Sequence, residues 1–220
     1  MGTVYSAEQL DANNRLVAVK LLELPKTLDE SEEAKAREGF QREAQAMSLL
    51  THPHTVRLYA YGDDAATGLL WLAMEKLDGM DLGEFIRLEA PIAPERAVRI
   101  VEQICRSVGD AHGHGIIHRD LKPANVFLCT HEGYPEWVKV LDFGIARILG
   151  EDVVSTGSGR FSGTPRTMAP EQCTGASTTR KTCEDKGVHD AQWCGALHEG
   201  VHDALWAEGQ PPVKAAAAVE

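Results

Sequence analysis

The stretch IIHRDLKPANVFL, residues 116–128, sets charged and amide side chains between two apolar runs. Burying several such groups is unfavourable unless each finds a partner, so an ordinary core strand would not contain them. The polar members are His118, Arg119, Asp120, Lys122 and Asn125. The pattern indicates a loop whose side chains have a chemical task.

The composition is that of a globular protein. The chain has 220 residues, 43% hydrophobic and 25% charged, which is enough for one domain or two small lobes. A formal net charge of -11 argues against a general binder of nucleic acid or acidic membranes. Five irregularly spaced cysteines favour reduced thiols and a cytoplasmic location. No apolar run is long enough to span a bilayer, so this segment is expected to make no membrane contact.

The first part of the chain has sequence patterns typical of strands. Short β-branched and apolar runs bounded by turn residues predict antiparallel strands over residues 17–24, 55–62 and 69–77. Between the first two, an apolar face with helical spacing predicts a helix over residues 31–50. The residues on that face are Ala36, Phe40, Ala44 and Met47.

The texture becomes helical after a boundary near residues 77–81. An apolar stripe that follows Pro94 predicts a helix over residues 94–112. Its members are Ala97, Ile100, Val101, Ile104, Val108 and Ala111. The polar stretch quoted above follows this helix, where rigid elements would position a loop.

With its companions, HRDLKPAN resembles the catalytic loop of protein kinases. The companions occur in that family's order: MGTVY at 1–5, VAVK ending at Lys20, Glu43 in the first helix, DFG at 142–144 and APE at 169–171. Five ordered matches make chance a poor explanation. The resemblance covers residues 1 to about 175, and the motif sequences are most similar to those of bacterial serine/threonine kinases of the eukaryotic (Hanks) type.

The resemblance implies an α+β fold of two lobes, incomplete at both ends. The N-terminal lobe, residues 1–77, would be a small antiparallel β lobe with one helix, without the first strand and part of the glycine-rich loop. The C-terminal lobe, residues 78–175, would be mainly α-helical and would carry the catalytic loop and activation segment. Residues 176–220 would be a divergent or truncated remainder of that lobe, or an unrelated tail.

The resemblance assigns four residues to phosphoryl transfer from ATP. Lys20 would hold the phosphates, and Glu43 would orient Lys20 through an ion pair. Asp120 would accept or orient the proton of the substrate hydroxyl. Lys122, at the position typical of serine/threonine kinases, would stabilise the moving phosphoryl group.

Two further residues would bind Mg²⁺. Asp142 follows the apolar run VKVL, where a carboxylate is well placed to bind a hard cation bridging the phosphates. Asn125 would hold a second Mg²⁺ through its amide oxygen. The plain alternative for Asp142, a turn residue before Gly144, would leave DFG unexplained.

Offsets from these motifs imply the nucleotide contacts. The backbone of Glu75 and Leu77, just after Met74, matches the hinge that hydrogen-bonds adenine, and Met74 would gate the deeper pocket. Asp81 falls where the family contacts ribose. The remaining candidates, in the phosphate loop and around adenine, are Gly2, Val4, Ala18, Phe127 and Leu141. Each of them alone is more typical of an ordinary core residue.

The segment between DFG and APE is rich in small hydroxyl residues, as flexible regulatory loops are. Candidate autophosphorylation sites are Ser155, Thr156, Ser158 and Ser162. Thr164 is instead expected to contact Asp120 and Lys122. Arg119 would bind a phosphate on this segment through its guanidinium.

His118 is expected to be a structural histidine packed beside Phe143. Two functions remain open for the whole chain. One is an ATP-dependent protein serine/threonine kinase acting on Ser and Thr hydroxyls of proteins, with itself as a candidate substrate. The other is a catalytically weak or inactive kinase-like ATP-binding, regulatory fragment. A small-molecule phosphotransferase is a third option, but Lys122 with the GTP and APE motifs favours a protein substrate.

Overall fold

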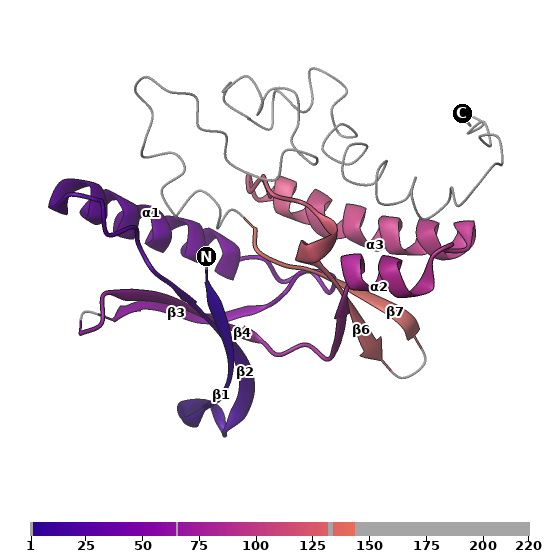
Figure 1. Cartoon of the computed structure of the whole chain (residues 1–220), viewed down its shortest axis with the longest axis horizontal. Coiled ribbons are helices and arrows are strands. Elements are labelled where there is room, and N and C mark those ends of the chain that lie inside the picture. The colour runs from indigo at the N-terminus through magenta and orange to yellow at the C-terminus, as the bar shows by residue number, and fades with distance from the viewer. Residues whose placement is uncertain (1, 65, 132–133, 144–220) are drawn as a thin grey trace, which may run out of the picture.

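The computed structural model describes residues 2–64, 66–131 and 134–143. Its first sheet is antiparallel and consists, in spatial order, of β1 (Thr3–Gln9), β2 (Arg15–Leu22), β4 (Leu69–Glu75) and β3 (Leu58–Asp64). The strands predicted at 17–24 and 69–77 are confirmed, each displaced by two residues or fewer at its ends. Figure 1 shows β1 and β2 crossing in front of β3 and β4, with the helix α1 alongside.

The strand predicted over 55–62 begins at Leu58, because Thr55 and Val56 bond to Val140 instead. Thr55 forms an isolated parallel bridge with Val140, and the N–H of Val56 donates to the carbonyl oxygen of Val140 at 2.9 Å. The β-branched residues at 55–56 therefore pair with Val140, outside the first sheet, and do not belong to the predicted strand.

The helix α1 (Glu30–Ser48) has a capping box at its N-terminus. The Asp29 side chain accepts from the Glu32 N–H at 2.8 Å, and the Glu32 side chain accepts from the Asp29 N–H at 3.0 Å. These bonds satisfy two backbone donors and set the start of the helix. The four predicted apolar residues are its buried ones: Ala36, Phe40, Ala44 and Met47.

The second half of the described chain contains β5 (Gly79–Asp81), α2 (Leu82–Glu89), α3 (Pro94–Gly113), β6 (Val126–His131) and β7 (Tyr134–Val140). The helix predicted over 94–112 is confirmed as α3. Ser107 joins its buried face because its hydroxyl lies 2.7 Å from that of Thr55, while Val101 is only partly buried. A polar residue on an apolar stripe is thus accommodated by a hydrogen bond.

A three-stranded sheet of order β5-β6-β7 completes this half. The sequence did not predict β5, α2, β6 or β7; β5 and α2, with three and eight residues, are too short to show a sustained pattern. At Gly79 a glycine is required: φ is 140°, and a Cβ atom there would lie 2.0 Å from the Leu128 carbonyl oxygen. The close approach of β5 to β6 therefore depends on this position.

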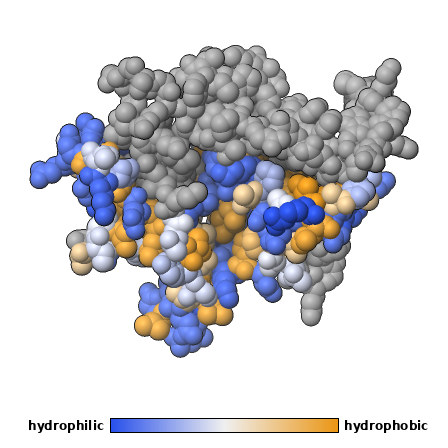
Figure 2. All heavy atoms as spheres, in the orientation of Figure 1, coloured by the Kyte–Doolittle hydropathy of each residue, from blue (hydrophilic) through white to orange (hydrophobic). Residues whose placement is uncertain are grey.

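One apolar core runs through both halves, from Leu22 and Phe40 to Val140 and Phe143. Figure 2 shows hydrophilic residues at the outer end of α1 and more hydrophobic ones toward the middle of the molecule. Within the described ranges, no helix combines the length and apolarity needed to cross a membrane. In the part of the chain that the structure describes, the first sheet with α1 and the second part with α2, α3 and the smaller sheet form the two-lobed α+β arrangement that the sequence predicted.

Candidate active site between the two sheets

An ion pair joins the first sheet to the end of the second. Lys20 lies on β2, opposite Val4 of β1 and Leu72 of β4. Its Nζ is 2.6 Å from Oδ2 of Asp142, and the two side chains are 16% and 25% exposed. Residues 122 positions apart in the sequence thus meet, and the partly buried setting makes this attraction stronger than at an open surface.

Asp120 has one carboxylate oxygen bound and one available. Oδ2 accepts from Lys122 Nζ at 2.7 Å and from Asn125 Nδ2 at 3.2 Å, while the same amide nitrogen also donates to the Asp120 backbone oxygen at 2.7 Å. Oδ1 is buried and has no hydrogen-bond partner in the described part of the chain. A buried acceptor of this kind is unfavourable unless a ligand or substrate group uses it.

Leu141 connects the catalytic loop to Asp142. Its N–H donates to the Asn125 carbonyl oxygen at 2.8 Å, and its own carbonyl oxygen lies 2.8 Å from Nε2 of His118. A carbonyl can only accept, so His118 carries a proton on Nε2. The backbone N–H and carbonyl oxygen of Leu141 are therefore both hydrogen-bonded to the loop that contains His118 and Asn125.

His118 is a structural residue, as predicted. Its side chain is 1% exposed, and its ring centroid lies 4.7 Å from that of Phe143. Burial lowers the pKa of His118, and this effect outweighs the bond to Leu141 and the charges of Asp142 and Asp120, which act in the opposite direction. The imidazole is consequently neutral near neutral pH.

The backbone is strained at two site residues. Arg119 has φ 66° and Asp142 has φ 59°, in the left-handed region that residues with a Cβ atom rarely adopt. Such a conformation costs about 1–2 kcal/mol per residue. The two bonds of Leu141 fix the backbone immediately before Asp142, whose side chain meets Lys20.

The residues predicted to contact the nucleotide lie along both sheets. Across β1 and β2, Gly2 borders Lys20, since a Cβ atom on Gly2 would be 3.2 Å from Lys20 Cε. Ala18 faces Met74 in the β2–β4 register. The predicted members of the adenine sandwich differ in exposure: Val4 is 58% exposed, whereas Ala18 and Leu141 are partly buried against the core.

Two predicted contacts also have structural tasks. Asp81, which lies opposite Phe127 in the β5–β6 register, caps α2 by accepting from the Glu84 N–H at 2.9 Å. Glu75 accepts from Lys139 Nζ at 2.6 Å, a partner that sequence reasoning missed. The alternation of VKVL placed Lys139 away from its buried neighbours but could not indicate what it faces.

Other predicted roles are not tested by these contacts. Glu43 lies partly buried on α1, and its ion pair with Lys20 stays a prediction. Arg119 precedes Asp120, but the phosphate site proposed for it involves residues outside the described ranges. The candidate phosphorylation sites are Ser155, Thr156, Ser158 and Ser162; Thr164, predicted to contact Asp120 and Lys122, also lies outside the described ranges.

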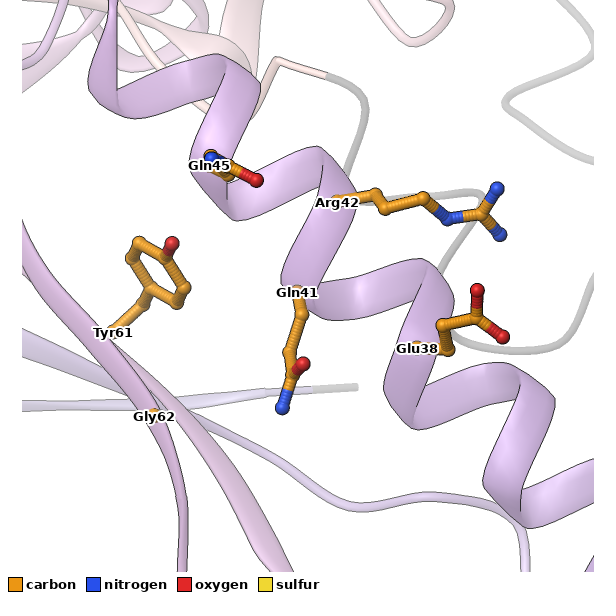
Figure 3. Close-up of a pocket in the computed structure, with 6 residues that line it drawn as sticks. All are labelled: Glu38, Gln41, Arg42, Gln45, Tyr61 and Gly62. Carbon is orange, nitrogen blue, oxygen red and sulfur yellow. The ribbon is translucent and has the colours of Figure 1, made fainter.

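A separate cavity lies between α1 and β3 (Figure 3). Its volume is about 320 Å³, and none of the residues predicted to form the site lines it. In Figure 3, Arg42 and Glu38 extend from one side of α1, while Tyr61 lies on the other. The lining residues are Glu38, Gln41, Arg42, Gln45, Tyr61 and Gly62.

The donors at the site fit Mg²⁺ bound together with phosphates. Within the described ranges, no group of three or more His, Cys, Asp or Glu residues could hold a metal by itself. Mg²⁺ commonly takes only one or two protein carboxylates and completes its shell with water and substrate phosphate. Asp142 and the amide oxygen of Asn125 are such oxygen donors, and the Asn125 carbonyl bond to Leu141 keeps them close.

The fold and the loop geometry define a two-lobed kinase-like protein. Comparison with known proteins agrees: the family model described as "Protein kinase domain" matches residues 1–183. The chain therefore belongs to the protein kinase domain family. The crystal structure of the Mycobacterium tuberculosis PknI kinase domain is similar, with a TM-score of 0.66 and 27% identity, over 96% of this chain and 74% of that one.

Curated relatives are bacterial serine/threonine kinases. The chain is 41% identical over 185 residues to the serine/threonine-protein kinase pkn3 of Myxococcus xanthus, covering 83% of this chain and 33% of that protein. It is 40% identical over 179 residues to the probable serine/threonine-protein kinase PknB of Lactococcus lactis, covering 81% of this chain and 27% of the relative. The chain thus spans a third or less of the length of these relatives.

Proposed function

We propose that this protein transfers the γ-phosphoryl group of ATP to Ser or Thr hydroxyls of proteins, with itself as one candidate substrate. The observation that carries the proposal is the state of Asp120. One of its oxygens is held by Lys122 and Asn125, while the other is buried without a partner in the described part of the chain. A substrate hydroxyl is the group that such an oxygen would accept from.

Each remaining side chain has a matching task. Lys20 would bind the nucleotide's phosphates and exchange part of its contact with Asp142 for them. Asp142 and Asn125 would hold Mg²⁺, which when bound neutralises the charge of the phosphates. Lys122, 2.7 Å from Asp120, would keep that carboxylate in place and face the transferred group. An arrangement of this kind would catalyse by positioning the two reactants and by stabilising the charge of the transition state, without a covalent intermediate.

Incubation of the protein with labelled ATP and Mg²⁺ tests the proposal. Asp120→Asn keeps the shape and the bonds to Lys122 but removes the base, so we expect incorporation of phosphate to fall about 100-fold or more. Asp142→Asn is expected to lower it in the same way by weakening the metal site. Equal labelling of the unaltered protein and both variants would contradict the proposal.

A kinase-like protein that binds ATP without turning it over is the competing function. Labelling separates the two: a protein that only binds ATP would show a thermal shift on MgATP addition, lost in Lys20→Ala, but no labelling in any form. Labelling of the unaltered protein alone would support the kinase.

A further inference from the structure

Three segments of the chain meet at Glu75, the last residue of β4. Its Oε1 accepts hydrogen bonds from Lys139 Nζ at 2.6 Å and from the Arg57 N–H at 2.8 Å. The Glu75 N–H donates in return to the Arg57 carbonyl oxygen at 2.9 Å, and Lys139 Nζ also donates to the Thr55 carbonyl oxygen at 3.3 Å. These contacts close a ring through Glu75, Arg57, Thr55 and Lys139, called here the Glu75 ring.

The Glu75 ring is largely withdrawn from solvent. The side chains of Lys139 and Glu75 are 14% and 20% exposed. Charges in such a setting interact more strongly than at an open surface, where mobile side chains and salt weaken an ion pair. Next to the ring, Val140 bonds to residues 54 and 56 through its backbone N–H and oxygen at 2.8 and 2.9 Å. The pair therefore rests on a rigid backbone frame.

The Glu75 ring lies between the segment expected to bind adenine and the residue expected to bind Mg²⁺ beside the phosphates. Glu75 begins the segment that is expected to contact adenine, and Lys139 precedes the metal ligand Asp142 by three residues. We propose that Glu75 and Lys139 are a positioning pair, which holds the adenine-binding segment at a fixed distance from Asp142. Base and phosphates can then be bound at once without a separate ordering step. This inference rests on the proposed function.

A purely stabilising ion pair would behave differently, and the chain offers one for comparison. Arg96 of α3 is paired with Glu136 of β7, whose side chain is 4% exposed. That pair joins a helix to the same strand as Lys139, but it does not include the end of β4. Arg96→Met is therefore a matched control for loss of a partly buried ion pair.

Calorimetric titration of the full chain with MgADP tests the pairing directly, without depending on turnover. Lys139→Met removes the charge and keeps the aliphatic stem, and Glu75→Gln keeps an acceptor for the Arg57 N–H. We expect each to weaken MgADP binding about tenfold, with the double variant no weaker than either single one, because the two residues act as one unit. Lys139→Arg keeps the charge and is expected to bind within about twofold of the unaltered protein. Arg96→Met should lower the melting temperature and leave the affinity unchanged.

Equal MgADP affinity in the unaltered protein, Lys139→Met and Glu75→Gln would overturn the inference and leave the proposed function standing. An equal loss in Arg96→Met would also overturn it, because the effect would then follow stability. Absence of MgADP binding by the unaltered protein would overturn the proposed function and this inference with it. If Lys139→Met does not fold, the comparison of Glu75→Gln with Lys139→Arg decides.

Discussion

Lys20 and Asp120 are both assigned to the proposed site, but different interactions hold them in place. Lys20 lies within a strand, where regular pairing with Val4 and Leu72 sets the direction of its side chain. Asp120 lies in a loop and is held by individual contacts with Lys122 and Asn125. A strand tolerates a changed side chain because its backbone bonds remain, whereas a loop held by side chains loses its shape with them.

We expect the largest effect on activity from changing Lys20, the site residue held by a strand. Lys20→Met should lower phosphoryl transfer about 100- to 1,000-fold, because a charge placed against the phosphates is lost while the strand pairing is kept. We expect the melting temperature to stay close to that of the unaltered protein. Labelling assays and thermal unfolding measure the two quantities. A large loss of stability with this variant would show that the ion pair with Asp142 holds the fold.

Changes in the loop around Asp120 should lower stability as well as activity. His118→Ala removes a fully buried ring and leaves the Leu141 carbonyl oxygen without its donor, so we expect the free energy of unfolding to fall by about 2–4 kcal/mol. Denaturant unfolding monitored by circular dichroism measures it. His114→Ala is a suitable control, since that imidazole is 43% exposed. Similar losses in both variants would contradict a special role for the buried ring.

The lowered pKa of His118 predicts how stability depends on pH. The unfolded chain has the ordinary histidine pKa of about 6.5, and the folded pKa lies below it. Stability is therefore fully present above the unfolded value and is lost as the pH falls toward the folded value, with a slope of up to ~1.4 kcal/mol per pH unit from this residue. Unfolding of the unaltered protein and of His118→Asn between pH 7 and pH 5 checks this. An equal slope in both would argue against His118 as the source.

We expect the smallest effect on stability from changing Arg37, which joins α1 to the first sheet. Arg37 is paired with Glu33 and Asp63 and also donates to the Gly68 carbonyl oxygen at 3.0 Å. These bonds raise the pKa of Arg37, chiefly through Glu33 and Asp63. Arg37→Met should lower the free energy of unfolding by about 1 kcal/mol. Arg106→Met, which removes an exposed helix pair with Glu102, is the control and should have a smaller effect.

Sequence periodicity and motifs predicted different parts of the molecule. The spacing of Ala36, Phe40, Ala44 and Met47 predicted the buried face of α1, because helix geometry alone places such residues together. The VAVK and DFG motifs predicted that Lys20 and Asp142 act on the same phosphates, and the structure places Lys20 Nζ 2.6 Å from Asp142 Oδ2. Periodicity did not predict β5 or α2, which are short: β5 pairs closely with β6 at Leu128, and α2 begins at the cap formed by Asp81.

Some contacts had no sequence signal at all. Nothing in the sequence indicated that Glu75 meets Lys139, 64 positions away, or that Thr55 and Ser107 share a hydrogen bond. Such pairs depend on the packing of whole elements against one another, which local patterns do not encode.

The sequence by itself determined the two long helices α1 and α3, the strands β2 and β4 and the family, because each of these depends on residue type and spacing along the chain. It also supplied the residues that are proposed to react. Only the tertiary structure decided which oxygen of Asp120 is available, which tautomer His118 adopts and which residues meet at Glu75. These features depend on distances of a few ångströms between distant segments, and such distances exist only once the core has packed.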